Sequence, residues 1–328
     1  MFASHLDKKI DTLDMVSLPN RNGYGEGLLE AGKRDTNVVA LAADLTESTR
    51  TLPFAEAFPK RFIQMGIAEQ NMASVASGMA AMGKIPFIAS YAMFSPGRNW
   101  EQIRTTIAYN NSNVKIIGAH AGISVGPDGA THQAIEDLAI MRVMPNMIVI
   151  APADVHEARK AVLAAAKHVG PVYIRIGRSN TPVVTTPESP FEIGKALRLY
   201  EPDASLGQSV GIVVTGSLLY NALKAASELT KEGVPVVVLH MPTIKPLDTA
   251  ALDRLANECS GLVTVEEHQR AGGLGGAVCE YLSEAKPLRI IRIGVDDQFG
   301  QSGEPEELIE HYGMGVSHIM AAVKKALL

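Results

Sequence analysis

A carboxylate beside a glycine turn is the first group in this sequence that could do chemistry. Glu69 lies in the segment Arg61–Met72 and begins a predicted helix of small residues. A carboxylate at a helix N-terminus most often only compensates the helix dipole. The alternative is a buried acid that shares a proton with a nitrogen atom of a ligand. The residue types alone leave both interpretations open.

An aromatic pair follows in the segment 90–104. Tyr91 and Phe94 are three residues apart, just beyond a predicted strand. Aromatic side chains at this spacing usually belong to the core. Their place outside the carboxyl end of a parallel strand favours a ligand platform instead, because open α/β sheets bind ligands at that edge.

A glycine-rich loop at 120–136 contains His120, Asp128 and His132. Loops on a rigid scaffold are where binding and catalytic residues concentrate. The spacing matches no common histidine–metal pattern and no thiolate is near, so we predict a binding loop without a metal site.

Two further patterns favour structural roles. The run GGLGGA at 272–277 resembles a dinucleotide fingerprint, but Val278 occupies the third glycine position and no acidic partner follows at the usual distance. We expect a tight turn at a helix start. Cys259 and Cys279 show no CxxC spacing and are expected to be reduced structural thiols.

Alternating elements must position these groups. Near-continuous Val, Ile and Ala runs indicate buried strands covered by helices on both faces. Asp154, with Glu157 three residues later, predicts a capping box at one helix start. The strands are expected at 38–42, 85–89, 114–118, 147–150 and 172–176, and the helices at about 22–33, 68–82, 98–109, 133–142 and 154–168.

The alternation resumes after a proline-containing break at 177–192. Strands are expected at 210–214, 236–240, 262–265 and 288–293, with helices at 217–231, 249–257 and 274–284 and two more closing the chain. The predicted fold class is therefore α/β, with two doubly wound domains: a mostly parallel sheet and a smaller Rossmann-like domain. The predicted limits are an N-terminal extension at 1–19, a first domain at 20–178, a linker at 179–192 and a second domain at 193–328.

Composition narrows the function classes. The 328 residues are 46% hydrophobic and 20% charged, with a formal net charge of −5. No basic run suggests nucleic acid or an anionic membrane as a partner. No stretch approaches the roughly 20 apolar residues that span a bilayer, and the start lacks the apolar core of a signal peptide. We expect a cytoplasmic metabolic protein.

Several runs together resemble the pyrimidine-binding and C-terminal domains of the transketolase family. They are GIAEQNM (66–72), GPDGATHQAIED (126–137), PADVHEA (152–158), TGSLLYNA (215–222) and TIKPLD (243–248), in the family's order. The resemblance extends from about residue 20 to the end. The second run is highly specific, whereas the first is shared with 1-deoxyxylulose-5-phosphate synthases and 2-oxo acid dehydrogenases.

The resemblance implies a site for thiamine diphosphate. Glu69 would hydrogen-bond to N1′ of the aminopyrimidine and act catalytically, while Tyr91 and Phe94 would stack on that ring. Asp44 matches a position near the cofactor at the subunit boundary. The residues 95–97, Ser-Pro-Gly, stand where the family has a further tyrosine.

The resemblance also implies a sugar phosphate site. Asp128 and His132 match residues that contact sugar hydroxyls, and His132 would orient the reacting substrate. Four residues match the family's phosphate-binding set: His120, Arg178, Arg21 and Ser48. The implied reaction is two-carbon ketol transfer from a ketose phosphate to an aldose phosphate, with pentose phosphates or a branched sugar such as apulose 4-phosphate as substrates.

The family's metal and diphosphate segment, GDG followed by an Asn, does not occur in this sequence. The resemblance therefore implies a separate N-terminal subunit that binds the diphosphate and its Mg²⁺ or Ca²⁺, with none bound by this chain. A homodimer of this chain within an α2β2 assembly is expected.

Three alternatives share parts of this pattern. The beta subunit of a 2-oxo acid dehydrogenase needs no sugar-recognising loop. A 1-deoxyxylulose-5-phosphate synthase normally forms one long chain. A non-catalytic assembly subunit would have no need of Glu69, Asp128 and His132 together. We therefore predict, from the resemblance, a split transketolase subunit.

Overall fold

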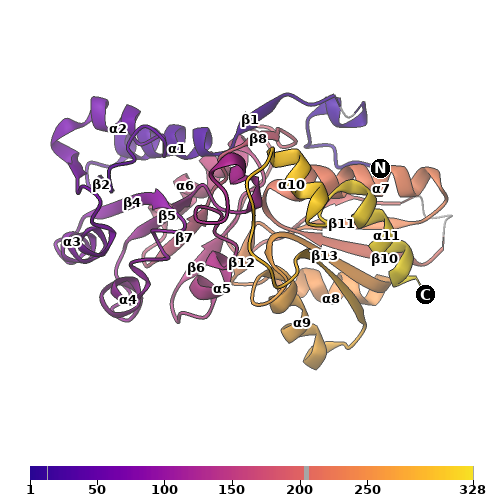
Figure 1. Cartoon of the computed structure of the whole chain (residues 1–328). Helices are drawn as coiled ribbons and strands as arrows, with labels where there is room; N and C mark the ends of the chain where they lie inside the picture. Colours follow the sequence, from indigo (N-terminus) through magenta and orange to yellow (C-terminus); the bar gives the residue numbers. More distant parts are fainter. Residues whose placement is uncertain (13, 203–206, 328) are drawn as a thin grey trace.

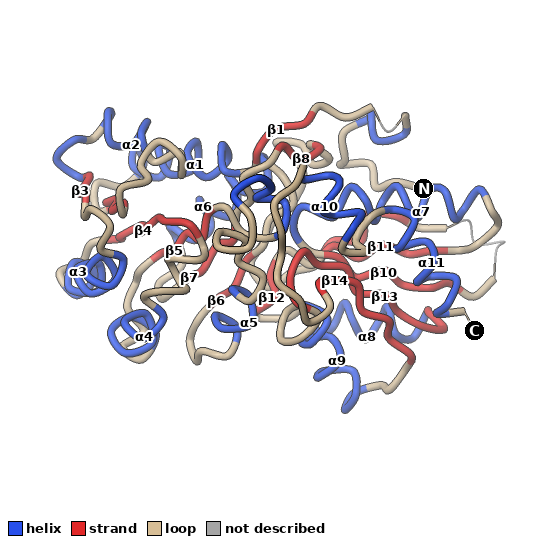
Figure 2. Tube along the Cα trace, in the orientation of Figure 1, coloured by secondary structure: helices blue, strands red, loops and turns tan. Residues whose placement is uncertain are grey.

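The structure is a computed structural model that describes residues 1–12, 14–202 and 207–327. Two sheets lie side by side, each covered by helices on both faces, and the N-terminal segment runs across them (Figure 1). Strands, helices and connecting loops are distinguished in Figure 2. The predicted α/β class with two doubly wound parts is confirmed.

The first sheet has seven strands in the order β12-β6-β7-β5-β4-β2-β3, parallel except for β12. Most of its strands are buried along their whole length, as expected for strands with helices on both sides. The strands are β2 (Val38–Ala42), β3 (Phe62–Gln64), β4 (Ile85–Tyr91), β5 (Lys115–Ala119), β6 (Ile148–Ile150), β7 (Val172–Arg175) and β12 (Thr243–Lys245).

Two hydrophobic clusters cover the faces of this sheet. One contains residues of α1 (Arg21–Arg34), α2 (Leu52–Ala57) and α6 (Val155–Lys167). The other contains residues of α3 (Glu69–Ala81), of a π-helical turn at Ile103–Ala108 that continues α4 (Trp100–Gln102), and of α5 (Asp137–Arg142). Most of the side chains named as chemical candidates follow the carboxyl ends of these strands, whereas Arg21 begins α1.

The second sheet has the order β14-β13-β10-β11-β9, parallel except for β9. Helices α7 and α11 pack on one face, and α8 and α9 on the other. The elements are β9 (Leu197–Tyr200), β10 (Ser209–Val214), α7 (Leu219–Lys231), β11 (Val236–His240), α8 (Thr249–Glu258), β13 (Cys259–Gln269), α9 (Leu274–Ala285), β14 (Arg289–Val295), α10 (Pro305–His311) and α11 (Val316–Ala326).

The proline-containing break between the sheets is a packed segment. β8 (Asn180–Pro182) pairs antiparallel with β1 (Ser17–Pro19). Asp154 fixes the residues after β8, because its carboxylate accepts hydrogen bonds from Thr185 Oγ1 and from the backbone amides of 184 and 185. The domain limits given above remain predictions.

Three of the local differences from the sequence prediction have a clear physical reason. The helix predicted at 133–142 begins only at Asp137, because Ala134 bridges to Ala121. The capping box is half formed. Asp154 accepts from the amides of 156 and 157, but Glu157 accepts from the amide of Ala153 rather than from that of Asp154. The strand predicted at 262–265 spans Cys259–Gln269.

The GGLGGA run is the predicted turn at a helix start. Gly272 has φ +79°, and α9 begins at Leu274, where Glu266 accepts from the amides of 274 and 275.

Both cysteines are free thiols, with Cys259 buried. Within the described ranges, no helix has the length and apolarity needed to cross a bilayer.

Candidate active site

The candidate residues gather at the carboxyl edge of the first sheet. Asp44 follows β2, Tyr91 ends β4, His120 follows β5 and Arg178 lies just beyond β7. These strands are parallel, so their carboxyl ends meet at one edge, which is where open α/β sheets bind ligands.

Glu69 is the first residue of α3 and its side chain is only 2% exposed. Its Oε2 accepts a hydrogen bond from Arg98 Nη1 at 3.0 Å. Among the described residues, Oε1 has no hydrogen-bond partner. A buried carboxylate therefore has one oxygen satisfied by the protein and one available to a ligand.

A contiguous array of rings lies beside this carboxylate. Tyr91 and Phe94 are stacked with centroids 6.1 Å apart and an interplanar angle of 19°. His120 stacks on Tyr91 at 3.8 Å, and His132 meets Phe94 edge-on at 5.6 Å. The Arg98 guanidinium lies 5.2 Å from the Phe94 ring centroid. The fold thus brings together the aromatic pair, the two loop histidines and, through Arg98, the Glu69 carboxylate.

His120 is held in its neutral form. Burial lowers its pKa to about 3, assisted by the positive charges of Arg21 and Arg178 and by His132. Its Nε2 lies 3.3 Å from Arg21 Nη1, and its Nδ1 is buried without a partner. Because a guanidinium can only donate, we assign Nε2 as the acceptor and place the proton on Nδ1. That N–H is an unsatisfied donor within the site.

Three guanidinium groups share this region. Burial lowers the pKa of Arg21, and the charges of Arg50 and Arg178 lower it further. Arg21 Nη1 donates to the Ser48 carbonyl at 2.8 Å, and Arg178 Nη1 pairs with Asp128 Oδ1 at 3.1 Å. The three positive charges repel one another, so an anion bound between them would be stabilised.

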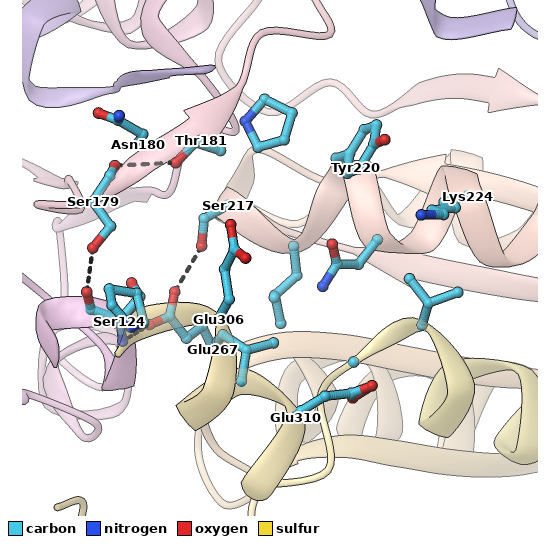
Figure 3. A pocket seen from close by; sticks show the side chains of 17 residues that line it. Ser124, Ser179, Asn180, Thr181, Ser217, Tyr220, Lys224, Glu267, Glu306 and Glu310 are labelled. Atoms are coloured by element: carbon cyan, nitrogen blue, oxygen red, sulfur yellow. Dashed lines mark hydrogen bonds between the residues drawn. The ribbon is translucent and has the colours of Figure 1, made fainter. Parts of the chain in front are cut away.

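The loop that carries Asp128 and His132 is fastened from the second half of the chain. Glu267, near the carboxyl end of β13, accepts from the Ser124 amide at 2.6 Å and from Ser217 Oγ at 2.7 Å. Figure 3 shows these contacts, together with the hydrogen bond that Ser179 donates to the Ser124 carbonyl. The four residues Ser124, Ser179, Ser217 and Glu267 are among those that line a cavity of about 500 Å³.

Two further predicted site residues, Asp44 and Ser48, make hydrogen bonds through their backbone atoms. Asp44 is exposed, and its backbone amide donates to Gln64 Oε1 at 2.9 Å. Among the described residues, no hydrogen bond or ion pair joins the Asp44 carboxylate to the other site residues. Ser48 contributes its carbonyl oxygen to Arg21.

Sequence reasoning missed Arg98, Arg50 and Asn99. Asn99 is fully buried and donates through Nδ2 to the Glu69 carbonyl at 3.0 Å. A signal was present, because Arg98 and Asn99 directly follow the aromatic pair and its Ser-Pro-Gly turn. Arg50 lies two residues after Ser48, in a stretch that the family resemblance links to phosphate binding.

The third aromatic position has no room for a side chain. A Cβ on Gly97 would lie 2.0 Å from the Met93 carbonyl oxygen. The site therefore has two aromatic rings from this segment, with Arg98 next to them.

Comparison with known proteins identifies the family of the chain. Residues 17–184 match the family model for the transketolase pyrimidine-binding domain, and residues 201–319 match the model for the transketolase C-terminal domain. A solved structure described as an inactive β4 tetramer of a split-gene transketolase is 47% identical, with a TM-score of 0.87. That similarity covers 94% of this chain and 98% of the solved one.

Two curated relatives are similar over nearly their whole length. A 6-deoxy-6-sulfo-D-fructose transketolase subunit (SqwH) of Clostridium sp. strain MSTE9 is 39% identical, covering 92% of each chain. An apulose-4-phosphate transketolase subunit of Phocaeicola vulgatus is 36% identical, covering 90% of this chain and 93% of its own. The chain belongs to the transketolase family, of which it contains the pyrimidine-binding and C-terminal domains.

Proposed function

We propose that this chain is one subunit of a split transketolase, which uses thiamine diphosphate to transfer a two-carbon ketol unit from a ketose phosphate to an aldose phosphate. The observation that carries the proposal is the buried Glu69 carboxylate. Its Oε1 is unpaired among the described residues, and its partner Arg98 lies over the Phe94 ring that stacks with Tyr91. The alternatives without sugar recognition give no account of the arginine cluster around His120.

The donor set fits the pyrimidine end of thiamine diphosphate. Glu69 Oε1 can hydrogen-bond to a ring nitrogen, and the two aromatic rings offer flat apolar surfaces. When bound, this cofactor supplies a thiazolium that holds the electron pair of the transferred two-carbon unit. We assign Asp44, which is exposed at the same edge of the sheet, to the boundary with the partner chain that would complete the cofactor site.

The remaining residues would bind the sugar phosphate. Arg21 and Arg178 supply positive charge to a phosphate dianion, and neutral His120 supplies the Nδ1 hydrogen. Ser48 is close to this group through its contact with Arg21. Asp128 and His132 would bind sugar hydroxyls, with His132 orienting the carbon that reacts. These contacts position the substrate and exclude water, and the cofactor carries the bond-breaking chemistry.

We infer that a separate N-terminal subunit binds the diphosphate and its Mg²⁺ or Ca²⁺. Within the described residues, no group of three or more His, Cys, Asp or Glu side chains could hold a metal ion. The relatives named above are themselves called subunits or split-gene products, which supports the same division here. We propose a homodimer of this chain within an α2β2 assembly.

The substrate class is a phosphorylated sugar, with pentose phosphates or a branched sugar such as apulose 4-phosphate as the first candidates. The relatives differ in the sugars that their names give, a sulfonated fructose in one and apulose 4-phosphate in the other. A terminal dianion is what the arginine cluster would select, so a screen of ketose and aldose phosphates is the appropriate assay.

The carboxylate role is tested in the pair reconstituted with the N-terminal subunit. We expect Glu69→Gln to lower kcat by about 10²–10⁴-fold, because general acid–base catalysis typically contributes that much. Glu101→Gln is the matched control, since Glu101 is exposed and accepts hydrogen bonds from Gln102 and Thr105 on the same helical segment. Wild-type turnover in Glu69→Gln would refute the proposed role.

The division of the cofactor site is tested by calorimetry. Thiamine diphosphate and Mg²⁺ should bind the isolated chain weakly or not at all, and should bind the reconstituted pair tightly. The physical reason is that the diphosphate carries most of the cofactor's charge and would lack its metal on this chain. Tight binding to the isolated chain would contradict the divided site.

A further inference from the structure

The Glu69–Arg98 pair is asymmetric in its exposure. The Glu69 side chain is 2% exposed, whereas that of Arg98 is 48% exposed. An exposed ion pair contributes little to stability. A buried carboxylate is different, because it must be paired or else take up a proton. Arg98 is the one cationic side chain that pairs with Glu69 among the described residues.

The backbone around Arg98 is fixed to the start of α3. Asn99 donates through Nδ2 to the Glu69 carbonyl at 3.0 Å and to Ser95 Oγ at 3.2 Å. The Arg98 amide donates to the Phe94 carbonyl at 3.1 Å. The guanidinium therefore reaches Oε2 from a backbone segment whose position is fixed. It lies over the Phe94 ring, 5.2 Å from the ring centroid.

We propose that Arg98 is a positioning residue that supplies the positive charge opposite the Glu69 carboxylate and holds its Oε2, so that Oε1 is the oxygen that shares a proton with the ligand's ring nitrogen. This inference rests on the proposed function and deepens it. Arg98 acts through Glu69 rather than on the substrate.

The charge of Arg98 and its shape make separate contributions. The opposite charge favours ionised Glu69, and the N-terminus of α3 favours it as well. The planar guanidinium occupies Oε2 while resting against Phe94, which fixes the rotation of the carboxylate. A lysine at this position would retain the charge without the planar contact.

The first experiment measures kcat and kcat/KM against pH in the reconstituted pair. In Arg98→Ala, the acid side of both profiles should move upward by about one pH unit or more, because the carboxylate loses the charge that opposes its protonation. Arg98→Lys should restore the position of the acid side but not the full kcat. Arg104→Ala, at an exposed arginine of the same segment, is the control. An unshifted acid side in Arg98→Ala overturns the proposal.

The second experiment needs no activity. The thermal midpoint of the isolated chain is compared among wild type, Arg98→Ala, Glu69→Gln and the double variant. Arg98→Ala should lower Tm at pH 8, and the loss should become smaller at low pH, because a carboxyl group that has taken up a proton no longer needs a positive partner. The double variant should match Glu69→Gln, because no buried charge remains to be paired.

The two experiments separate the possible failures. Additive losses in the double variant would show that Arg98 acts independently of Glu69, which overturns the inference whatever the enzyme does. If the expected coupling is found while the wild-type pair shows no ketol transfer, the proposed function fails and the charge role of Arg98 remains.

Discussion

His120 takes its charge state from its surroundings. Burial and the neighbouring guanidinium groups lower its pKa to about 3, so it stays neutral at every pH at which the protein would work. His120 therefore contributes no pH dependence to anion binding near neutrality, whereas a phosphate monoester ligand does, since its second pKa lies near 6. The histidine serves as a constant hydrogen-bond donor.

Arg178 offers a test of the phosphate site at the residue scale. Arg178→Ala should raise KM for phosphorylated sugars by roughly 5- to 150-fold, because one charged hydrogen-bonding partner contributes about 1–3 kcal/mol. Steady-state kinetics with a ketose and its phosphate measure this, and the unphosphorylated sugar should be much less affected.

A structural disturbance of the loop would give a different result. Arg178 also bonds to Val125 O and Asp128, so loss of the loop would affect both sugars equally. Arg104→Ala serves again as the control. An unchanged KM for the phosphorylated sugar would remove Arg178 from the phosphate site.

Single residues differed in how far the sequence could reveal them. Glu69, Tyr91, Phe94 and His132 could be proposed from the sequence because each stands in a run with a recognisable local pattern. Arg98 could not be proposed, because its role depends on a contact with a carboxylate 29 residues away. Contacts over that distance are determined by the path of the chain in the fold. Arginines without a local pattern are usually solvated, so type alone gave no reason to choose it.

The segment from Phe94 to Asn99 shows how one turn can determine a site. A Cβ on Gly97 would lie 2.0 Å from Met93 O, so Gly97→Ala must displace the backbone that carries Arg98. We expect a loss of about 1–3 kcal/mol in stability and a lower Tm, together with reduced activity. Differential scanning calorimetry of the isolated chain gives the stability part.

Gly78→Ala is the matched control for this substitution. Gly78 lies inside α3, with nothing within 4 Å of the added Cβ. That change should be neutral or stabilising, because alanine favours a helix interior over glycine by about 0.5–1 kcal/mol. Equal stability of the two variants would show that the turn tolerates a side chain.

Among elements, long periodic segments were predicted well and short ones were not. The helices from Leu219 and Val155 follow their apolar periodicity closely. The helix predicted from residue 133 failed because Gln133 bonds through Nε2 to the Ile123 and Gln301 carbonyls, which ties the segment to loops distant in sequence. β12 has only three residues, too few for any period to be visible.

At the scale of the whole molecule, α6 joins the two sheets. Glu157 Oε2 lies 2.8 Å from His240 Nε2, and both side chains are buried. Burial opposes the charged imidazole, but the Glu157 carboxylate and the Val214 carbonyl outweigh it and raise the pKa of His240. The pair is thus a charged contact between an element of the first half and a strand of the second.

Substitution of His240 tests this contact. The folded pKa is raised above the unfolded value of about 6.5, so the stabilisation is complete below that pH and is lost as pH rises through the folded pKa. His240→Asn should therefore cost about 3–5 kcal/mol at pH 6, and less as pH increases. Denaturant unfolding of both proteins between pH 6 and 9 measures the difference. Burial lowers the pKa of Lys115 to about 7, but this group titrates in both proteins and its contribution cancels.

The exposed His311 provides the comparison for this measurement. His311→Asn should change stability little at any pH. A cost of His240→Asn that stays constant from pH 6 to 9 would show that the contact is a neutral hydrogen bond rather than an ion pair.

The strand Thr243–Lys245 comes from the second half of the chain but seals the outer edge of the first sheet, where it pairs with β6. A polypeptide ending before residue 200 would leave the backbone groups of β6 open, and an open flat edge invites other chains to add to it. The first half therefore depends on the second for the cover of this edge, and we expect the first half alone to aggregate.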